Sequence, residues 1–171
     1  MHLSDETASA RPGLFSLTQI QHLMRVEFAR SQRYGYPLSC LVLSIDDLVR
    51  VRERHGFDSK ETVVRTVADV VRLETRTSDY LGRTPDDRLL CIVPHTSMVG
   101  LAVMGRRILE RVQAVQFESP AGRYSVSLSI GASACEPGKT LFFDALLQAA
   151  EAALADARRD GGSCLFTRDV G

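Results

Sequence analysis

Residues 76–94 read RTSDYLGRTPDDRLLCIVP, and this stretch contains the turn around which the rest of the fold can be predicted. Two short apolar runs, 80–83 and 89–93, flank a turn of one Thr, one Pro and two Asp at 84–87. Proline and aspartate favour tight turns, because proline presets φ and aspartate bonds to nearby backbone amides. The stretch therefore predicts a β-hairpin, with the charged residues Arg76 and Asp79 directly before its first strand.

On both sides of this hairpin the sequence alternates between helix and strand patterns. Residues 38–45 form a nearly continuous apolar run, which indicates a central strand buried on both faces. Apolar residues recur at helical spacing in four segments: from 16 to about 32, in the segment that follows Asp58, from 101 to 112 and from 144 to 159. Asp58 can cap the second of these helices. Residues 123–134 alternate like a half-buried strand, and 164–167 suit an edge strand. We expect one α/β (α+β) domain over 14–171, a mixed central sheet covered by helices, after a flexible tail at 1–13.

The composition argues against several classes of function. The 171 residues include 21 basic and 21 acidic side chains, so no overall field attracts nucleic acid or a membrane surface. The four cysteines show no CxxC spacing, and two lie in apolar runs, which predicts buried reduced thiols rather than zinc ligands or disulfides. No apolar run approaches the roughly 18 residues of a membrane span, so we expect a cytoplasmic protein without membrane insertion.

Several short motifs on these elements together resemble the GGDEF domain of diguanylate cyclases over roughly residues 16–167. None is specific alone, but their order and register match. They are the strand PLSCLVLSID, His55-Gly56, the Arg-Thr-Ser-Asp of 76–79, Arg83, the strand LLCIVP, Thr96, the Ser-Leu-Ser-Ile-Gly of 127–131 and Ala150-Glu151. The resemblance implies a nucleotide-cyclase-like fold that holds GTP between the end of the first strand and the hairpin.

The resemblance also implies where the catalytic groups would stand, and most of these positions carry unsuitable side chains. Joining two GTP molecules requires Mg²⁺ held by carboxylates. The first such position is Ser44, at the start of a motif that ends in Asp46, and Asp87 alone remains of the side-chain metal ligands. The carboxylate that assists deprotonation of the attacking hydroxyl is replaced by Arg88, which stays protonated. We therefore expect a degenerate domain without enzyme activity and without a Mg²⁺ cofactor.

The positions implied to hold the nucleotide are altered as well. In place of Gly-Gly-Asp/Glu-Glu-Phe the chain has PDDRL at 85–89. Without the two glycines the turn loses bare backbone, and it gains a charge that repels phosphate. The other positions are Arg52 and Glu61 for the asparagine and aspartate that read guanine, Val49 and Gly162 for a lysine and an arginine that bind phosphate, and Arg158 for a second lysine.

A different site of the family is kept. The resemblance implies that an Arg-x-x-Asp motif five residues before the signature is the inhibitory site for cyclic di-GMP, and Arg76 and Asp79 have this offset. Arg107, on the next predicted helix, matches the secondary arginine of that site. Arginine can contact guanine O6 and N7 with two bonds, and aspartate can accept from guanine N–H groups. We predict a catalytically inactive cyclic di-GMP receptor, with a second protomer or a protein partner.

Other interpretations stay open. Arg and Asp three residues apart at a helix end also form an ordinary ion pair, and the domain would then be a ligand-independent scaffold for protein interaction. A weak diguanylate cyclase is a more remote alternative. Asp46 and Asp47 are expected to serve as a helix cap or a solvated turn rather than to bind a metal. Residues 17–20 stand where the family has a longer wedge, which puts its catalytic dimer in question.

Overall fold

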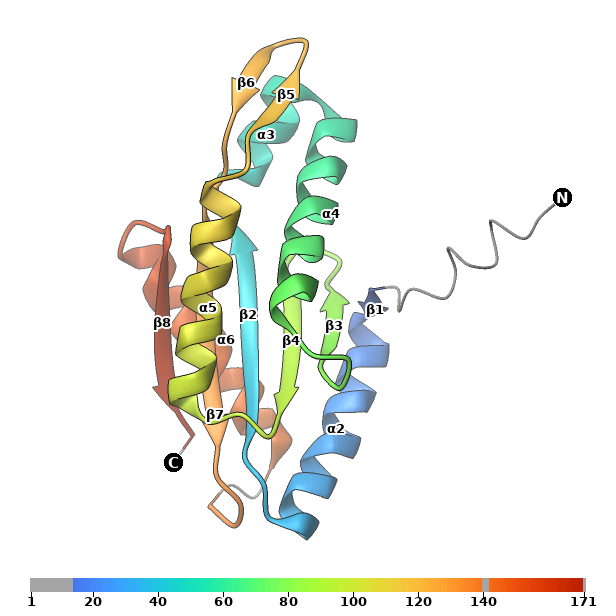
Figure 1. Ribbon diagram of the computed structural model, residues 1–171, viewed down its shortest axis with the longest axis vertical. Coiled ribbons are helices and arrows are strands. Elements are labelled where there is room, and N and C mark those ends of the chain that lie inside the picture. Colours follow the sequence, from blue (N-terminus) through green and yellow to red (C-terminus); the bar gives the residue numbers. More distant parts are fainter. Residues whose placement is uncertain (1–13, 140–141, 171) are drawn as a thin grey trace, which may run out of the picture.

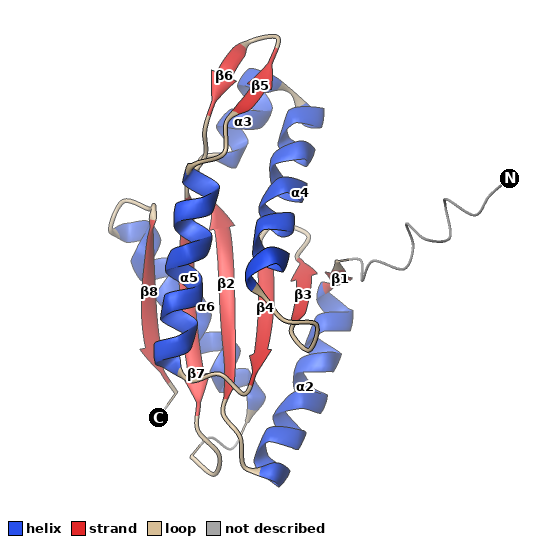
Figure 2. Ribbon diagram, viewed as in Figure 1, coloured by secondary structure: helices blue, strands red, loops and turns tan. Residues whose placement is uncertain are grey.

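The computed structural model describes residues 14–139 and 142–170, and it confirms a mixed central sheet covered by helices (Figures 1 and 2). The strands of this sheet are β1 (Phe15–Ser16), β2 (Leu38–Ile45), β3 (Tyr80–Arg83), β4 (Leu89–Pro94), β7 (Leu128–Cys135) and β8 (Cys164–Asp169). Their order is β1-β3-β4-β2-β7-β8. β1 is parallel to β3 and β7 to β8, whereas β2 is antiparallel to both of its neighbours. The predicted hairpin is β3–β4, and β2 is central as expected.

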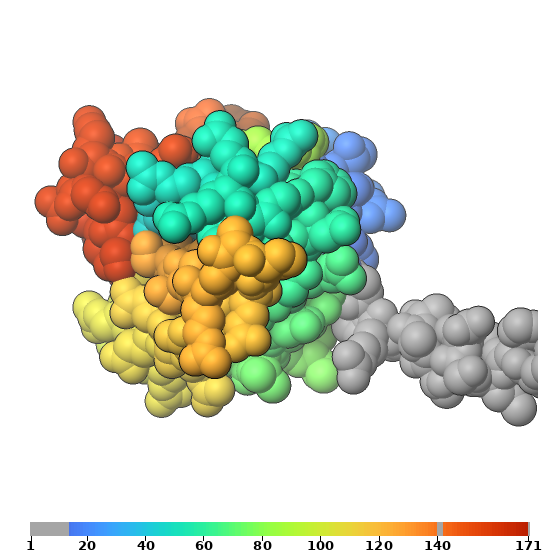
Figure 3. Space-filling model, turned by 90° about the horizontal axis from the view of Figure 1, so that it is seen from above, coloured from blue at the N-terminus to red at the C-terminus, as the bar shows by residue number. Residues whose placement is uncertain are grey.

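The helices cover the two faces of the sheet. One face carries α4 (Phe57–Glu74) and α5 (Met98–Gln113), and the other carries α2 (Leu17–Tyr34) and α6 (Phe143–Arg159). The short α3 (Leu48–His55) follows the end of β2. A separate hairpin of β5 (Phe117–Ser119) and β6 (Gly122–Tyr124) lies against α3 and α4 (Figure 3). His55 holds this hairpin in place. Its ring stacks on that of Tyr124 with the centroids 3.9 Å apart, and its Nδ1 shares a hydrogen bond of 2.6 Å with Ser119 Oγ.

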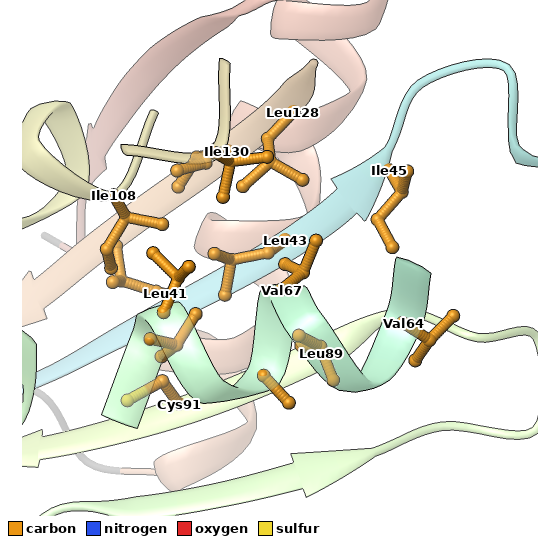
Figure 4. Close-up of a cluster of buried hydrophobic side chains, with 14 of the residues drawn as sticks. Leu41, Leu43, Ile45, Val64, Val67, Leu89, Cys91, Ile108, Leu128 and Ile130 are labelled. Carbon is orange, nitrogen blue, oxygen red and sulfur yellow. The ribbon is translucent and has the colours of Figure 1, made fainter. Parts of the chain in front are cut away.

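The central strand supplies both hydrophobic layers. Leu41, Leu43 and Ile45 pack in the cluster beneath α4 and α5 (Figure 4), whereas Cys40 and Val42 pack beneath α2 and α6. Successive side chains of a strand point to opposite faces, so a strand buried on both sides must be apolar throughout. Each fully buried Leu or Ile side chain contributes about 1.5–3 kcal/mol. These two layers hold the loops at the end of β2 in place.

Local signals set the ends of α2. The Oγ of Ser16 accepts from the amide of Gln19, and the Gln19 Oε1 accepts from the amide of Ser16, which forms a capping box. Gly35 ends the helix in the left-handed region, at φ 75°. The helix therefore begins as predicted and extends slightly beyond residue 32.

The predicted cap of α4 is wrong. The helix begins at Phe57 with Gly56 in the cap position, so Asp58 lies inside the first turn. A carboxylate there still interacts favourably with the positive end of the helix, but it does not bond to the amides as a cap would.

The strand predicted at 123–134 is also corrected. It is divided between β6 and β7, and β7 is buried along nearly its whole length rather than on one face. Its serines are buried because their hydroxyls donate inside the protein, Ser129 to Asp46 at 2.6 Å and Ser133 to the carbonyl of Leu146 at 2.6 Å. The alternation of serine with apolar residues therefore led to the prediction of a strand with one exposed face, although these serines are buried.

All four cysteines are free thiols. Cys40, Cys91 and Cys135 are buried as predicted, whereas Cys164 is only partly buried. The tail predicted at 1–13 lies outside the described residues. In the ranges 14–139 and 142–170, none of the helices has the length and apolar character that crossing a bilayer requires.

Candidate functional site

The charged residues Arg76 and Asp79 lie in the turn that joins α4 to β3. The amide of Asp79 donates to the carbonyl of Arg76 at 3.0 Å and closes the turn. Asp79 Oδ2 accepts from the backbone amide of Arg76 at 2.8 Å, while Arg76 Nε lies 3.9 Å from the same oxygen. Asp79 therefore holds this turn mainly through the backbone, and its ionic contact with the guanidinium is long.

The guanidinium of Arg76 reaches the loop that follows β4. Its Nη2 donates to the carbonyl of Pro94 at 2.8 Å and to the hydroxyl of Thr96 at 2.7 Å. The side chain is nevertheless 56% exposed. Within the described part of the chain Nη1 donates to no acceptor, so Arg76 combines two structural contacts through Nη2 with a further donor nitrogen that is left for another partner.

The carboxylate of Asp79 is buried, with 2% of its side chain exposed. Its Oδ1 has no hydrogen-bond partner among the described residues. Burial raises the pKa of Asp79, although the backbone amide of Arg76 opposes the shift. A buried carboxylate oxygen without a donor is costly, so an N–H group brought by a ligand would be stabilised here.

A cavity of about 260 Å³ opens beside this turn. Its wall includes Arg72, Arg76 and Asp79, together with the rings of Phe15 and Tyr80, whose centroids are 6.3 Å apart. Pockets that enclose a whole drug-sized ligand measure roughly 300–1,000 Å³. This cavity has room for one flat ring system near the charged residues, and a larger ligand would extend beyond it.

Arg107 lies on the neighbouring helix. α5 packs along α4, and Arg111 Nε lies 2.5 Å from Glu74 Oε1 near the end of α4. Arg107 precedes Arg111 by one helical turn, shares its face and is exposed. In the described ranges it makes no hydrogen bond or ion pair with Arg76 or Asp79, so the three predicted residues lie on adjoining elements without forming a closed site.

A buried carboxylate that sequence reasoning missed, Glu27, connects this region to α2. Its oxygens accept from the hydroxyls of Tyr80 at 3.0 Å and Tyr36 at 2.9 Å. Burial, and then the bond to Glu27, raise the pKa of Tyr36 to about 12. Tyr36 stacks at 3.8 Å on His95, which belongs to the loop that Arg76 contacts. The available signal was a glutamate inside the apolar stripe of α2.

A larger cavity, of about 570 Å³, lies where the end of β2 meets α3, the start of α4, the β3–β4 turn and the end of α6. It gathers most of the positions that the resemblance assigned to catalysis and nucleotide binding. Those in its lining are Ser44, Val49, Arg52, Asp87, Arg88 and Arg158. Asp46 and Gly162 line an adjoining hollow, and Glu61 is reached through an ion pair with the lining residue Lys60.

Two carboxylates and two cations form a closed network beside this cavity. Asp87 Oδ1 accepts from Arg83 Nε at 3.0 Å and Nη2 at 2.5 Å, and Oδ2 accepts from Lys60 Nζ at 2.9 Å. The carboxylate of Glu61 accepts hydrogen bonds from both terminal nitrogens of Arg83, at 2.7 and 3.0 Å, and pairs with Lys60 Nζ at 2.8 Å. The bonds from Arg83 first, and from Lys60 second, lower the pKa of Glu61 to about 2. All four carboxylate oxygens contact a cation.

The turn of the hairpin is built for these ion pairs. Asp87 has a left-handed φ of 64°, so a non-glycine residue takes the unusual conformation. Burial alone would raise the pKa of Asp87, but the bonds from Arg83 and Lys60 outweigh it and lower the pKa. Arg88 turns toward Asp86 at 2.9 Å. The acidic turn is thus neutralised by neighbouring cations of the same chain.

Asp46 organises the backbone at the end of β2. Its Oδ1 accepts from Ser129 at 2.6 Å, and its Oδ2 accepts from the hydroxyl of Ser127 at 2.7 Å and the amide of Ser163 at 2.9 Å. Asp47 is exposed at φ 55°, and its side chain does not cap α3. The prediction that these residues cap a helix is therefore wrong for both, whereas the alternative prediction, a solvated turn, is correct for Asp47.

The Mg²⁺ that the family resemblance implies does not fit the residues of the larger cavity. Mg²⁺ takes oxygen ligands in near-octahedral geometry and is usually anchored by one or two carboxylates. Ser44 offers only a neutral hydroxyl, and both oxygens of Asp87 already contact cations. Across residues 14–139 and 142–170, no three His, Cys, Asp or Glu side chains are grouped in a way that could hold a metal ion.

Comparison with known proteins identifies the family of this arrangement. Residues 12–164 match the model described as diguanylate cyclase, GGDEF domain. The diguanylate cyclase DosC of Escherichia coli is 26% identical over 166 residues, which are 93% of this chain and 36% of DosC. The chain thus spans about a third of the length of this curated relative.

Solved structures share the fold. The coiled coil and GGDEF domain of DgcB from Caulobacter crescentus, in complex with c-di-GMP, has a TM-score of 0.84 at 18% identity, covering 91% of this chain and 82% of that one. The diguanylate cyclase SiaD of Pseudomonas aeruginosa, in complex with its activator SiaC, has a TM-score of 0.83 at 26% identity, covering 91% and 59%.

Proposed function

Because the chain belongs to the GGDEF domain family, whose named relatives are diguanylate cyclases, we propose that it is a member that binds cyclic di-GMP without synthesising it. Arg76 and Asp79 contact the ligand from the turn before β3, and Arg107 approaches it from α5. The domain then acts as a receptor or regulatory module rather than as an enzyme.

The observation that carries this proposal is the unmatched carboxylate oxygen beside an exposed guanidinium. Asp79 Oδ1 is buried, faces no donor within the described residues, and belongs to a side chain that lines the smaller cavity. Guanine presents N–H donors on one edge and the acceptors O6 and N7 on another. A guanine in the cavity would supply a donor to Asp79 and accept from the solvent-facing edge of Arg76.

The size of the cavity supports a second covering surface. At about 260 Å³ it holds one base of a dinucleotide and leaves the other base outside. Arg107 supplies one more cation on the adjoining helix, and another protomer or a protein partner would cover the remainder. SiaD, a relative of similar fold, has been solved in complex with an activator protein, which supports a protein partner for this domain as well.

The proposed lack of synthesis is supported by the side chains of the larger cavity. Ser44 cannot supply the negative charge that a divalent cation needs, and Arg88 cannot accept a proton at neutral pH. Asp87, the one carboxylate left at a metal-ligand position, has both oxygens engaged by Lys60 and Arg83.

Titration calorimetry with cyclic di-GMP tests the proposal. Binding is expected for the natural chain, and Arg76→Ala should weaken it by about 10- to 100-fold, because a bidentate contact to guanine is lost. Arg107→Ala should weaken it less. Arg65→Ala, which removes an exposed arginine from the middle of α4, is the matched control and should leave it unchanged. If calorimetry shows no heat at tens of micromolar cyclic di-GMP, the proposal that the domain is a receptor is refuted. If the protein forms product from GTP and Mg²⁺, the proposal that it does not synthesise cyclic di-GMP is refuted.

A second candidate function, a ligand-independent scaffold, is favoured by two contacts of Arg76. Arg76 Nη2 already donates to Pro94 and Thr96, so the arginine also has a purely structural use. A scaffold would capture its protein partner equally well with and without the dinucleotide. A pull-down in which capture is lost after the nucleotide is removed would count against it.

A further inference from the structure

The larger cavity holds a lysine at the carboxylate where the chemistry of the family requires a metal ion. We propose that the ammonium of Lys60 is the permanent cation of this site and that it excludes divalent ions from it. This inference goes beyond the proposed function, since it concerns the other cavity and holds whether or not cyclic di-GMP binds near Arg76.

The position of Lys60 indicates a dedicated role. Lysine is almost never buried unless it is paired, and Lys60 is 8% exposed. It lies in the first turn of α4, where its amide donates to the carbonyl of Gly56 at 3.1 Å. The other lysine of the chain, Lys139, is exposed.

The ammonium is held from three sides. Nζ lies 2.8 Å from Glu61 Oε1 and 2.9 Å from Asp87 Oδ2. The ring of Phe57 lies on another side, with its centroid 4.8 Å from Nζ, which is within the range of a cation–π contact. A charge with two carboxylates and an aromatic face around it occupies the position at Asp87 that a metal ion would need.

Counting charges shows why a divalent ion would be rejected. Glu61 and Asp87 contribute two negative charges, and Lys60 and Arg83 contribute two positive charges, so the network is neutral. A divalent ion at Asp87 would leave this network with a net charge of two, next to an ammonium that lies within hydrogen-bond distance of the same carboxylate. The ion would also have to displace donors that already satisfy each oxygen.

Ser44 makes the test sharper, because it lines the same cavity as Lys60 and Asp87 without adding charge. If the lysine is the obstacle, then adding a carboxylate at residue 44 is not enough to create a metal site. The carboxylate should become effective only when the ammonium is also removed. A slightly shorter neutral side chain, glutamine, and a larger one that keeps the charge, arginine, separate electrostatic exclusion from simple occupation of space.

The experiment is a calorimetric titration of Mn²⁺ alone, without nucleotide, into variants confirmed as folded by circular dichroism. Ser44→Asp is expected to bind weakly, and Ser44→Asp/Lys60→Gln should bind at least about tenfold tighter, because the positive charge is gone. Ser44→Asp/Lys60→Arg should behave like Ser44→Asp. Ser44→Asp/Lys139→Gln is the control for loss of a lysine elsewhere and should also behave like Ser44→Asp.

Two outcomes would overturn the proposal. One is Mn²⁺ binding by the natural chain that disappears in Asp87→Asn, and the other is equal affinity of Ser44→Asp and Ser44→Asp/Lys60→Gln. If Ser44→Asp/Lys60→Gln does not fold, Ser44→Asp/Lys60→Met decides. Mn²⁺ at millimolar concentration should raise its melting temperature more than that of Ser44→Asp, and an equal response of the two variants refutes the idea. Cyclic di-GMP affinity should be unchanged in every variant, so failure here is distinguishable from failure of the receptor.

Discussion

The two cavities differ in how their carboxylates are satisfied. Beside the larger one, every oxygen of Glu61 and Asp87 contacts a cation of the same chain. Beside the smaller one, Asp79 Oδ2 is bonded to a backbone amide, whereas Oδ1 has no donor in the part of the chain that is described. Charges matched internally need nothing from outside and become costly only when one partner is removed, while a buried unmatched group destabilises the fold until a donor arrives. This difference is the reason for proposing a structural role for the network beside the larger cavity and a ligand-binding role for the smaller one.

The largest expected effect is on the matched network. Arg83→Met would leave Glu61 and Asp87 with Lys60 as their only cation, and we expect the free energy of unfolding to fall by about 3 kcal/mol. Urea denaturation measures it. Arg107→Met, which removes an exposed arginine, is the control and should change stability by less than about 0.5 kcal/mol. A loss below about 1 kcal/mol for Arg83→Met would show that the network is not structural.

The next effect is smaller and depends on pH. The pKa of Glu61 lies at about 2 in the folded protein, below its ordinary 4.5, so its contribution is present above 4.5 and is lost as pH falls through about 2. Glu61→Gln should therefore lower the free energy of unfolding by about 2 kcal/mol at neutral pH, after allowance for partial exposure of the pair. The difference from the natural chain should shrink steadily in urea titrations at progressively lower pH. A difference independent of pH would contradict the ion pairs.

The smallest effect on stability is expected at the unmatched site. The pKa of Asp79 is raised above its ordinary 3.8 by burial, so its contribution is favourable below that value and is lost as pH rises through the folded pKa. Asp79→Asn should therefore leave the unfolding free energy at neutral pH unchanged, or raise it by up to about 1 kcal/mol. Cyclic di-GMP binding should fall at least about tenfold in the same variant. A destabilisation above about 1 kcal/mol would mean that Asp79 serves only as a structural ion pair.

Most of the fold could be predicted from sequence because its signals are local. The apolar run of β2, the turn of the hairpin and the helical spacing of α2, α5 and α6 each require one environment. The cap of α4 was wrong because Gly56 rather than Asp58 precedes its first turn, and the strand at 123–134 was wrong because distant groups satisfy its polar side chains. Ser129 and Ser133 are buried because Asp46 and the carbonyl of Leu146 accept from them, and nothing near residue 130 in the sequence indicates this.

The candidate sites divide in the same way. Ser44, Asp87 and Arg88 could be assigned to one cavity from their motifs, and the structure brings them together. Lys60 and Glu27 were missed, because a single lysine or glutamate on a helix carries no pattern, and their importance comes from partners that are far away in sequence.

The sequence by itself determined most of the order of the elements, the central position of β2 and the side chains at the positions that the family resemblance assigns to catalysis, because these follow from the chemistry and spacing of neighbouring residues. Only the tertiary structure decided which charges are matched. Lys60 comes within 2.9 Å of Asp87, 27 positions away in the chain, and Asp79 is buried with one oxygen lacking a donor among the described groups. Burial and pairing of charges arise from contacts between distant segments, and such contacts form only when the helices pack on the sheet.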